Sequence, residues 1–190
     1  MPAKRNFDNE EILDRVMRTS WEHGYKGTSL EDLARATGLR KGSLYNAFGN
    51  KEDLFLLALE RYAKLFDRRF EDALNDPDPY RAIQGFLEVV IERMSEPSNP
   101  RGCLSTYACT EWQDLPPKAA AKVSQALTEL EERLTTLIER QQHNLSSQQD
   151  ARSLARFFIA TTRGMATLHK VTGNLDAVKD VAKCALAVLN

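Results

Sequence analysis

The chain has 190 residues, and its 26 Lys and Arg against 27 Asp and Glu give a formal net charge of -1. This balance excludes a generally basic surface, so any affinity for nucleic acid has to come from a local cluster of charges. No run of the sequence approaches the roughly 18 apolar residues of a membrane span, so we expect no membrane contact. Three cysteines and an N-terminus without the apolar core of a secretion signal favour a cytoplasmic protein with reduced thiols.

Apolar residues recur every three or four positions along most of the chain, which is typical of amphipathic helices. No stretch alternates like a β-strand, so we expect an all-α fold of about nine helices. A loose basic arm is expected over residues 1–7, followed by a helix that begins at Asp8 or Asn9 and ends at Gly24. The later helices are expected at residues 28–37, 40–48, 51–74, 80–94, 102–112, 118–143, 148–172 and 175–189, with a turn at 144–147.

Residues 28–51 predict two short helices joined by a tight turn. Leu33 and Ala34 lie on one face of the first helix, and the small alanine allows a second helix to cross closely. Gly38 can take the left-handed conformation that ends a helix, and Leu44 can fix the second helix on the first. The pattern indicates a helix-turn-helix, which can place its second helix in the major groove of DNA. A surface helix pair with ordinary solvated charges is the alternative.

The segment over residues 12–55 resembles the DNA-binding domain of the TetR/AcrR family of transcriptional regulators. The residues that carry this resemblance at their spacing are Gly24-Tyr25, Thr28-Ser29, Leu33-Ala34, Gly38, Lys41-Gly42, Leu44-Tyr45, Phe48 and Lys51. The resemblance implies an N-terminal three-helix helix-turn-helix domain over residues 1–51. A long helix would join it to a helical-bundle effector-binding and dimerisation domain over residues 52–190. The function implied is that of a homodimeric regulator, in our interpretation a repressor, that binds double-stranded palindromic operator DNA. It would respond to an unknown small-molecule effector and need no cofactor.

By the same resemblance, four residues are implied to contact the DNA backbone, and we expect a fifth, Arg40, to join them although it departs from the family pattern. Thr28 is expected at a helix N-terminus, where its hydroxyl and amide can bind a phosphate. Lys41 and Lys51 can neutralise phosphates, and Gly42 permits a close approach of the DNA backbone. Arg40 stands where the family usually has a small capping residue. We expect its guanidinium to bind a phosphate rather than a guanine, and its helix to lack a good N-cap.

Three further residues of the second helix, Ser43, Tyr45 and Asn46, are implied to face the bases. An asparagine can read adenine bidentately, while a tyrosine more often contacts a phosphate or a thymine methyl. The resemblance therefore divides the motif into phosphate anchors and base readers.

The C-terminal part of the chain is rich in aromatic residues and methionines, most of which we expect in the core. A small-molecule sensor needs an apolar cavity with a few polar groups. The candidates for the effector site are Phe86, Met94, Cys103, Tyr107, Glu111, Trp112, Phe157 and Thr161.

Cys103 is the sharpest of these candidates. It lies near an expected helix start and beside Arg101, and both features stabilise a thiolate. The segment 101–104 resembles the start of the sixth helix in one subgroup of the family. In some relatives, a similar cysteine senses electrophiles or oxidants. Such sensing is the alternative to a reversible small-molecule ligand as the signal. The alternative role of Cys103 itself is that of a small buried hydrophobe. Cys109 is poorly placed to bridge Cys103 within one helix, and Cys184, among alanines, is expected to pack.

The last two helices are expected to form the dimer surface, because the family uses them so and because both have wide apolar stripes. The interface residues predicted are Phe158, Thr162, Met165, Val178, Ala182, Ala185 and Leu189.

No enzyme is expected. His23, His143 and His169 stand in no metal-ligand spacing, and the sequence has no Gly-rich phosphate loop or nucleophile elbow. Two alternatives of other classes stay open. One is a helical small-molecule-binding protein or enzyme without DNA binding, and the other is a protein-interaction adaptor built on the amphipathic helices.

Overall fold

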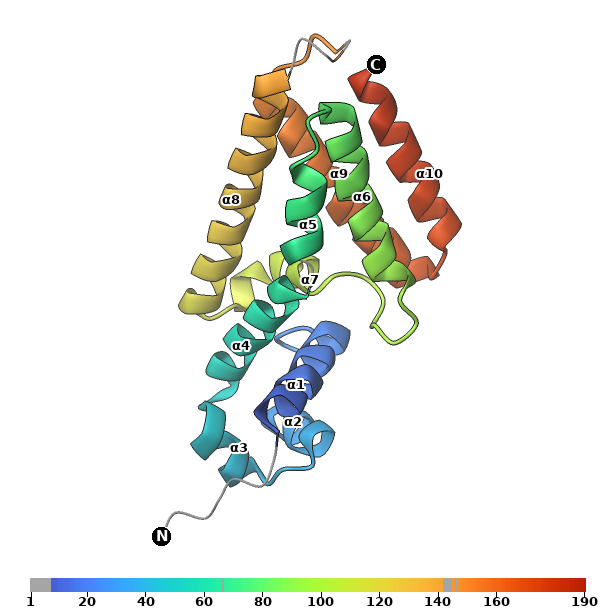
Figure 1. Cartoon of the computed structure of the whole chain (residues 1–190). Coiled ribbons are helices and arrows are strands. Elements are labelled where there is room, and N and C mark those ends of the chain that lie inside the picture. Colours follow the sequence, from blue (N-terminus) through green and yellow to red (C-terminus); the bar gives the residue numbers. More distant parts are fainter. Residues whose placement is uncertain (1–7, 66, 142–144, 146) are drawn as a thin grey trace.

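The computed structural model describes residues 8–65, 67–141, 145 and 147–190. These residues form ten α-helices and two 3-10 helices and contain no strand, which confirms the all-α prediction (Figure 1). The α-helices are α1 Asn9–His23, α2 Leu30–Thr37, α3 Lys41–Phe48, α4 Lys51–Lys64, α5 Asp67–Leu74, α6 Pro79–Ser95, α7 Leu104–Thr110, α8 Pro117–Gln141, α9 Ala151–Thr172 and α10 Leu175–Leu186. The 3-10 helices are η1 Trp112–Asp114 and η3 Ala187–Leu189. The expected basic arm, residues 142–143 of the expected long helix and part of the expected turn at 144–147 lie outside the described residues.

Helices α1, α2 and α3 form a small head at one end of the molecule (Figure 1). α1 begins where predicted, because the Asp8 side chain accepts a hydrogen bond from the amide two residues on, at 2.9 Å. The capping residue of α2 is Ser29 rather than Thr28, and Ser29 forms a reciprocal capping box with Asp32. Gly38 ends α2 in the predicted left-handed conformation, with φ of 72°.

The connection from the head to the rest of the chain is made by two helices instead of the single helix expected over residues 51–74. α4 ends at Lys64 and α5 begins at Asp67. Leu65 still has right-handed helical angles, and residue 66 lies outside the described part. α4 packs mainly on α1, whereas α5 packs mainly on α6, so the packing partner changes where the helix is divided.

The body of the molecule consists of α5, α6, α8, α9 and α10, with α7 and η1 where the body meets the head (Figure 1). α8 packs along α9, and α10 packs against α9 and α6. The buried apolar side chains form one core that continues from head to body. At the junction, Trp21 of α1 packs edge-on against Tyr62 of α4, with ring centroids 4.7 Å apart. The head is therefore packed on the body rather than tethered to it.

Among the described helices, none combines the length and the apolar character that a bilayer-spanning segment requires.

Candidate DNA-binding surface and thiol site

Helix α3 presents a polar face to solvent. Leu44 is fully buried and fixes the helix on the head, while the side chains of Ser43, Tyr45 and Asn46 are exposed. Tyr45 keeps 57% of its surface accessible although it is a large aromatic residue. The three predicted base readers thus lie together on the outer face of one helix, as a reading surface requires.

The start of α3 carries the basic residues. Arg40 is exposed at the N-cap position and makes no capping hydrogen bond, so the expected lack of a good cap is confirmed. Lys41 is also exposed and pairs with Glu31 of α2. A side chain added at Gly42 would meet no atom within 4 Å, so packing inside the chain does not require this glycine. Arg40 and Lys41 are placed beside the reading face, where a phosphate can reach them.

Two predicted phosphate anchors, Thr28 and Lys51, have side chains that make contacts within the chain. Thr28 is 2% exposed, and its hydroxyl donates to the Gly24 carbonyl at 2.6 Å, so its side chain closes the loop between α1 and α2. The Lys51 ammonium lies 4.3 Å from the centroid of the Tyr25 ring. Burial lowers the pKa of Lys51, and the Glu111 carboxylate partly offsets this. The Thr28 side chain is therefore not available to a phosphate, whereas the half-exposed Lys51, at the start of α4, stays a predicted phosphate anchor.

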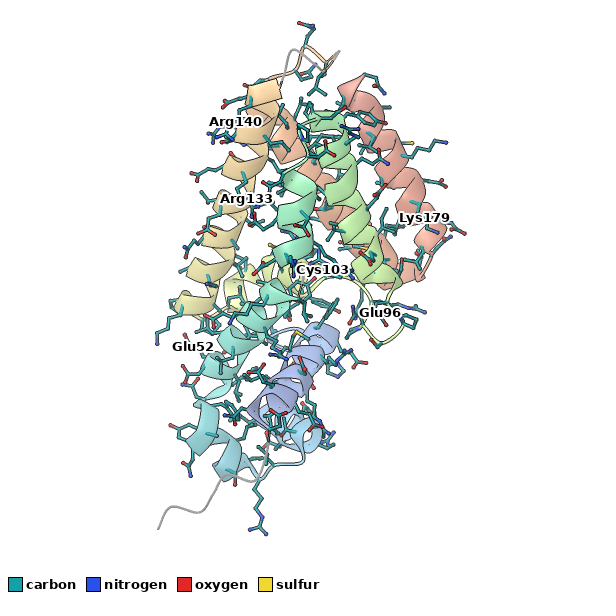
Figure 2. The ribbon with its side chains drawn as sticks, viewed as in Figure 1. Glu52, Glu96, Cys103, Arg133, Arg140 and Lys179 are labelled. Carbon is teal, nitrogen blue, oxygen red and sulfur yellow. The ribbon has the colours of Figure 1, made fainter. Side chains whose placement is uncertain are left out.

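A second candidate site surrounds Cys103, the N-cap residue of α7, which is 3% exposed (Figure 2). The Tyr62 hydroxyl donates to its sulfur at 3.0 Å, and the Ser105 hydroxyl lies 3.1 Å from it. The Arg163 Nη1 lies 3.7 Å from the sulfur and donates to the Ser105 hydroxyl at 2.7 Å. With Arg93, whose guanidinium lies 5.1 Å from the Tyr62 ring centroid, these residues form what we call the thiol site.

The thiol site stabilises a thiolate. Burial alone would raise the pKa of Cys103, but the charges of Arg93 and Arg163 and the hydrogen bonds from Ser105 and Tyr62 lower it to about 5. Burial raises the pKa of Tyr62 well above its usual value, so its phenol remains a donor. The cysteine is therefore ionised at neutral pH, which is the nucleophilic form of a thiol.

The cations that act on Cys103 are Arg93 and Arg163, and not Arg101, which was expected from the sequence. Arg101 lies against Gly173, and burial, together with the charge of Arg101, lowers the pKa of His169. Sequence reasoning missed Arg93 and Arg163, which come from α6 and α9. One signal existed: Arg93 falls on the apolar stripe of α6, seven residues after Phe86, and a buried arginine needs an anionic or hydrogen-bonding partner.

A cavity of about 150 Å³ opens beside Cys103 between α7 and α9. Its lining consists of Gly102, Cys103, Thr106, Tyr107, Thr110, Ala166, Thr167, Lys170 and Val171. We call it the thiol cavity. Of the eight predicted effector residues, only Cys103 and Tyr107 line it.

The other six predicted effector residues are dispersed. Phe86 and Met94 are buried in the core of α6, and Glu111 reaches the head instead of the cavity. Trp112 in η1 and Phe157 in α9 are exposed, and the Thr161 hydroxyl donates to the Phe157 carbonyl.

A larger groove of about 630 Å³ lies between α5 and α8. An ion pair of 2.9 Å between Arg133 and Glu71 spans it, and Leu74 and Leu137 contribute apolar surface. No predicted effector residue lines this groove.

The residues predicted to form a dimer interface are all buried inside the single chain. Phe158, Thr162, Met165, Val178, Ala182, Ala185 and Leu189 belong to the inner faces of α9, α10 and η3. Their apolar stripe is thus the contact of these helices with their own core. The outward faces of α9, α10 and η3 carry other apolar residues, namely Phe157, Val171, Val181 and Val188. Cys184, expected to pack, is exposed on α10.

Comparison with known families decides what kind of protein carries these two sites. Residues 79–185 match the family described as "Tetracyclin repressor-like, C-terminal domain", and residues 12–58 match "Bacterial regulatory proteins, tetR family". The chain belongs to the TetR family of bacterial transcriptional regulators. Within the described residues, no group of His, Cys, Asp and Glu side chains is placed to hold a metal ion.

Individual TetR-family proteins are similar over much of the chain. It is 27% identical to the uncharacterized HTH-type regulator YezE of Bacillus subtilis (strain 168), over 100% of both chains. It is 35% identical to the HTH-type transcriptional repressor ComR of Escherichia coli (strain K12), over 55% of this chain and 50% of ComR. A cysteine mutant of the TetR-family regulator CifR, solved with 26-base-pair operator DNA, has a TM-score of 0.86 at 28% identity, covering 98% of this chain and 100% of that one. The present TetR-family chain is therefore a DNA-binding transcriptional repressor and not an enzyme.

Proposed function

We propose that this repressor binds a palindromic operator as a homodimer and that covalent modification of Cys103 releases it from DNA. The observation that carries the proposal is the thiol site: a buried cysteine with a pKa of about 5 beside a small cavity. A cysteine held as a thiolate at neutral pH reacts faster with electrophiles and oxidants than an ordinary thiol does. We place the protein in the cytoplasm, with its operator.

The chemistry of the release step follows from the thiolate. Its sulfur attacks an electrophilic carbon and forms a carbon–sulfur bond, while a leaving group departs with its electron pair or a conjugate acceptor takes a proton from water. The neutral sulfur that results no longer attracts Arg93 and Arg163 as the thiolate does. An adduct larger than the cavity of about 150 Å³ also has to displace α7 or α9. Modification thereby favours a different arrangement of α7, and only such a difference between two states can change operator affinity.

The dimer is supported by the outward faces of α9 and α10. One recognition helix reads too few base pairs for a specific operator, so two heads related by a two-fold axis are needed. Exposed apolar residues on both helices, including Phe157 at 40% and Val181 at 37% exposure, favour a four-helix interface between two α9–α10 pairs. The interface we propose uses this outer face and not the inner stripe. The two recognition helices then have to lie about 34–36 Å apart, one turn of DNA.

Footprinting on the DNA that flanks the gene tests the operator. We expect protection of the DNA with two-fold symmetry. This protection should be lost in the Lys41→Ala, Tyr45→Ala double variant, because both side chains are exposed on α3. A Lys118→Ala variant at the exposed start of α8 is the control. Protection that survives the double variant would reject α3 as the reading helix.

A reversible small-molecule effector is the second candidate, because the groove between α5 and α8 has a volume of about 630 Å³. A compound screen on the Cys103→Ser protein separates the two. A compound that weakens operator binding by this protein supports the groove, and a response that needs the thiol supports Cys103.

A further inference from the structure

The body reaches the DNA-binding head at the C-terminal end of α7. The Glu111 carboxylate accepts a hydrogen bond from the Tyr25 amide at 2.6 Å and another from the Lys26 amide at 3.3 Å. The Lys26 ammonium in turn lies 3.2 Å from the Asp114 carboxylate in η1. One short segment of the body, from Glu111 to Asp114, thus holds the loop between α1 and α2 through two backbone amides and the Lys26 side chain.

The fit at this contact is close. A Cβ atom added at Gly24 would lie 2.7 Å from both carboxylate oxygens of Glu111, and Gly24 has a φ of +74°. A glycine is therefore required here, both for the backbone conformation and for the approach of the carboxylate. The loop that Glu111 holds leads within three residues to Ser29, the N-cap of α2. The position of this loop therefore sets the positions of α2 and α3 relative to the body.

The same short helix connects this contact to the thiol site. α7 is seven residues long, with Cys103 as its N-cap and Glu111 as its C-cap. Its inner residues Leu104 and Ala108 are fully buried, so it is expected to move as one rigid element. A displacement at one cap therefore reaches the other.

A second link runs from the thiol cavity to the same part of the head. Lys170, which lines the cavity, donates from its ammonium to the Glu22 carbonyl at the end of α1, at 3.2 Å. The ammonium also lies 4.9 Å from the centroid of the Tyr107 ring, another part of the lining. Two contacts from the surroundings of the cavity thus converge on residues 22–26 of the head.

We propose that Glu111 is a positioning residue: it couples the thiol site to the DNA-binding head by holding the Tyr25 and Lys26 amides. This proposal rests on the proposed function, in which covalent modification of Cys103 is the signal. Charged acceptors make stronger hydrogen bonds than neutral ones, and a carboxylate can accept from two amides at once. A glutamine at this position keeps one acceptor but turns a donor toward the second amide, so Glu111→Gln releases the loop with little change in side-chain volume.

The test measures operator affinity by fluorescence anisotropy in a Cys109→Ser, Cys184→Ser background, before and after alkylation of Cys103 by iodoacetamide. For the reduced Glu111→Gln protein we expect operator affinity about tenfold weaker than that of the parent. Alkylation should weaken the parent further by a factor of ten or more, and weaken the Glu111→Gln protein by less than about twofold. Glu132→Gln, an exposed carboxylate on α8, is the matched control and should behave as the parent.

A second readout shows whether the head is released or merely unfolded. Hydrogen exchange at the Tyr25 and Lys26 amides should quicken in Glu111→Gln, while the amides of α1 and α6 keep their protection. If the reduced Glu111→Gln protein binds operator as tightly as the parent, the coupling role is wrong. It is also wrong if alkylation weakens both proteins by the same factor. If alkylation leaves the parent unaffected, the thiol response fails, and the role of Glu111 in positioning the head is then decided by the affinity of the reduced protein alone.

Discussion

Removal of Arg163 should raise the pKa of Cys103 part of the way back to that of an ordinary thiol. Arg163 lies 3.7 Å from the sulfur through Nη1 and donates to the Ser105 hydroxyl at 2.7 Å, so it acts on the thiolate directly and through a hydrogen-bonded neighbour. Arg163→Met keeps the length of the side chain and removes its charge. Arg93 and the Tyr62 hydroxyl remain in place, which leaves part of the stabilisation intact.

The magnitude follows from the charges at the site. A thiol with a pKa of about 5 is roughly 99% ionised at pH 7, against roughly 3% for an ordinary cysteine of pKa about 8.5. An opposite charge at this distance shifts a pKa by about 1–3 units. The midpoint for ionisation of Cys103 should therefore rise from about 5 to between about 6 and 8 in Arg163→Met.

The assay is the rate of alkylation by iodoacetamide at a series of pH values between 4 and 9, followed by mass spectrometry. Because Cys109 is half-buried and Cys184 is exposed, both are replaced by serine so that only Cys103 reacts. Arg156→Met is the matched control, since Arg156 also lies on α9 but pairs with Glu131. A midpoint near 8.5 in the parent, or an unchanged midpoint in Arg163→Met, would refute the electrostatic argument.

Three further predictions concern the pH dependence of stability, the cap of α2 and the dimer face. The pKa of Cys103 is lower in the folded chain than in the unfolded chain, so its stabilisation is present above about pH 8.5 and is lost as the pH falls through about 5. Urea unfolding at pH 8 and pH 5 should differ by about 3 kcal/mol more in the parent than in Cys103→Ala, and equal differences would contradict this. Ser29→Ala removes the cap of α2 and should lower the free energy of unfolding by about 1 kcal/mol. Ser124→Ala, on the exposed face of α8, is the control and should leave the free energy of unfolding unchanged. Urea titration measures both variants. Val181→Arg on the outer face of α10 should give a folded monomer in sedimentation, and a Val181→Arg dimer would reject the proposed interface. Val178→Arg on the buried face of the same helix should instead unfold the chain.

Local features of the fold could be predicted from the sequence, because each depends on residues close in the chain. Asp8 as a cap and Gly38 as a helix end follow from the propensities of these residues, whereas the exposed face around Tyr45 was implied by the family resemblance. The cap of α2 was misplaced by one residue, since Thr28 and Ser29 are both capable of capping and only the fold buries the first.

The thiol site could be predicted only in part. Helix position made Cys103 a candidate, but its stabilising partners Tyr62, Arg93 and Arg163 come from three different helices and meet only through tertiary packing. The residues predicted for the dimer interface are buried in the chain for a related reason: an apolar stripe such as that around Phe158 does not distinguish the core of the chain from a contact with a second chain.

The central measurement is the affinity of the protein for its operator before and after alkylation of Cys103 alone. With Cys109 and Cys184 replaced by serine, stoichiometric treatment with iodoacetamide should weaken operator binding by a factor of ten or more, and the same treatment of the Cys103→Ser protein should leave it unchanged. The factor corresponds to at least about 1.4 kcal/mol of coupling between thiol and DNA. Equal operator affinity of the alkylated and the reduced protein would contradict the claim that the thiol site controls the repressor.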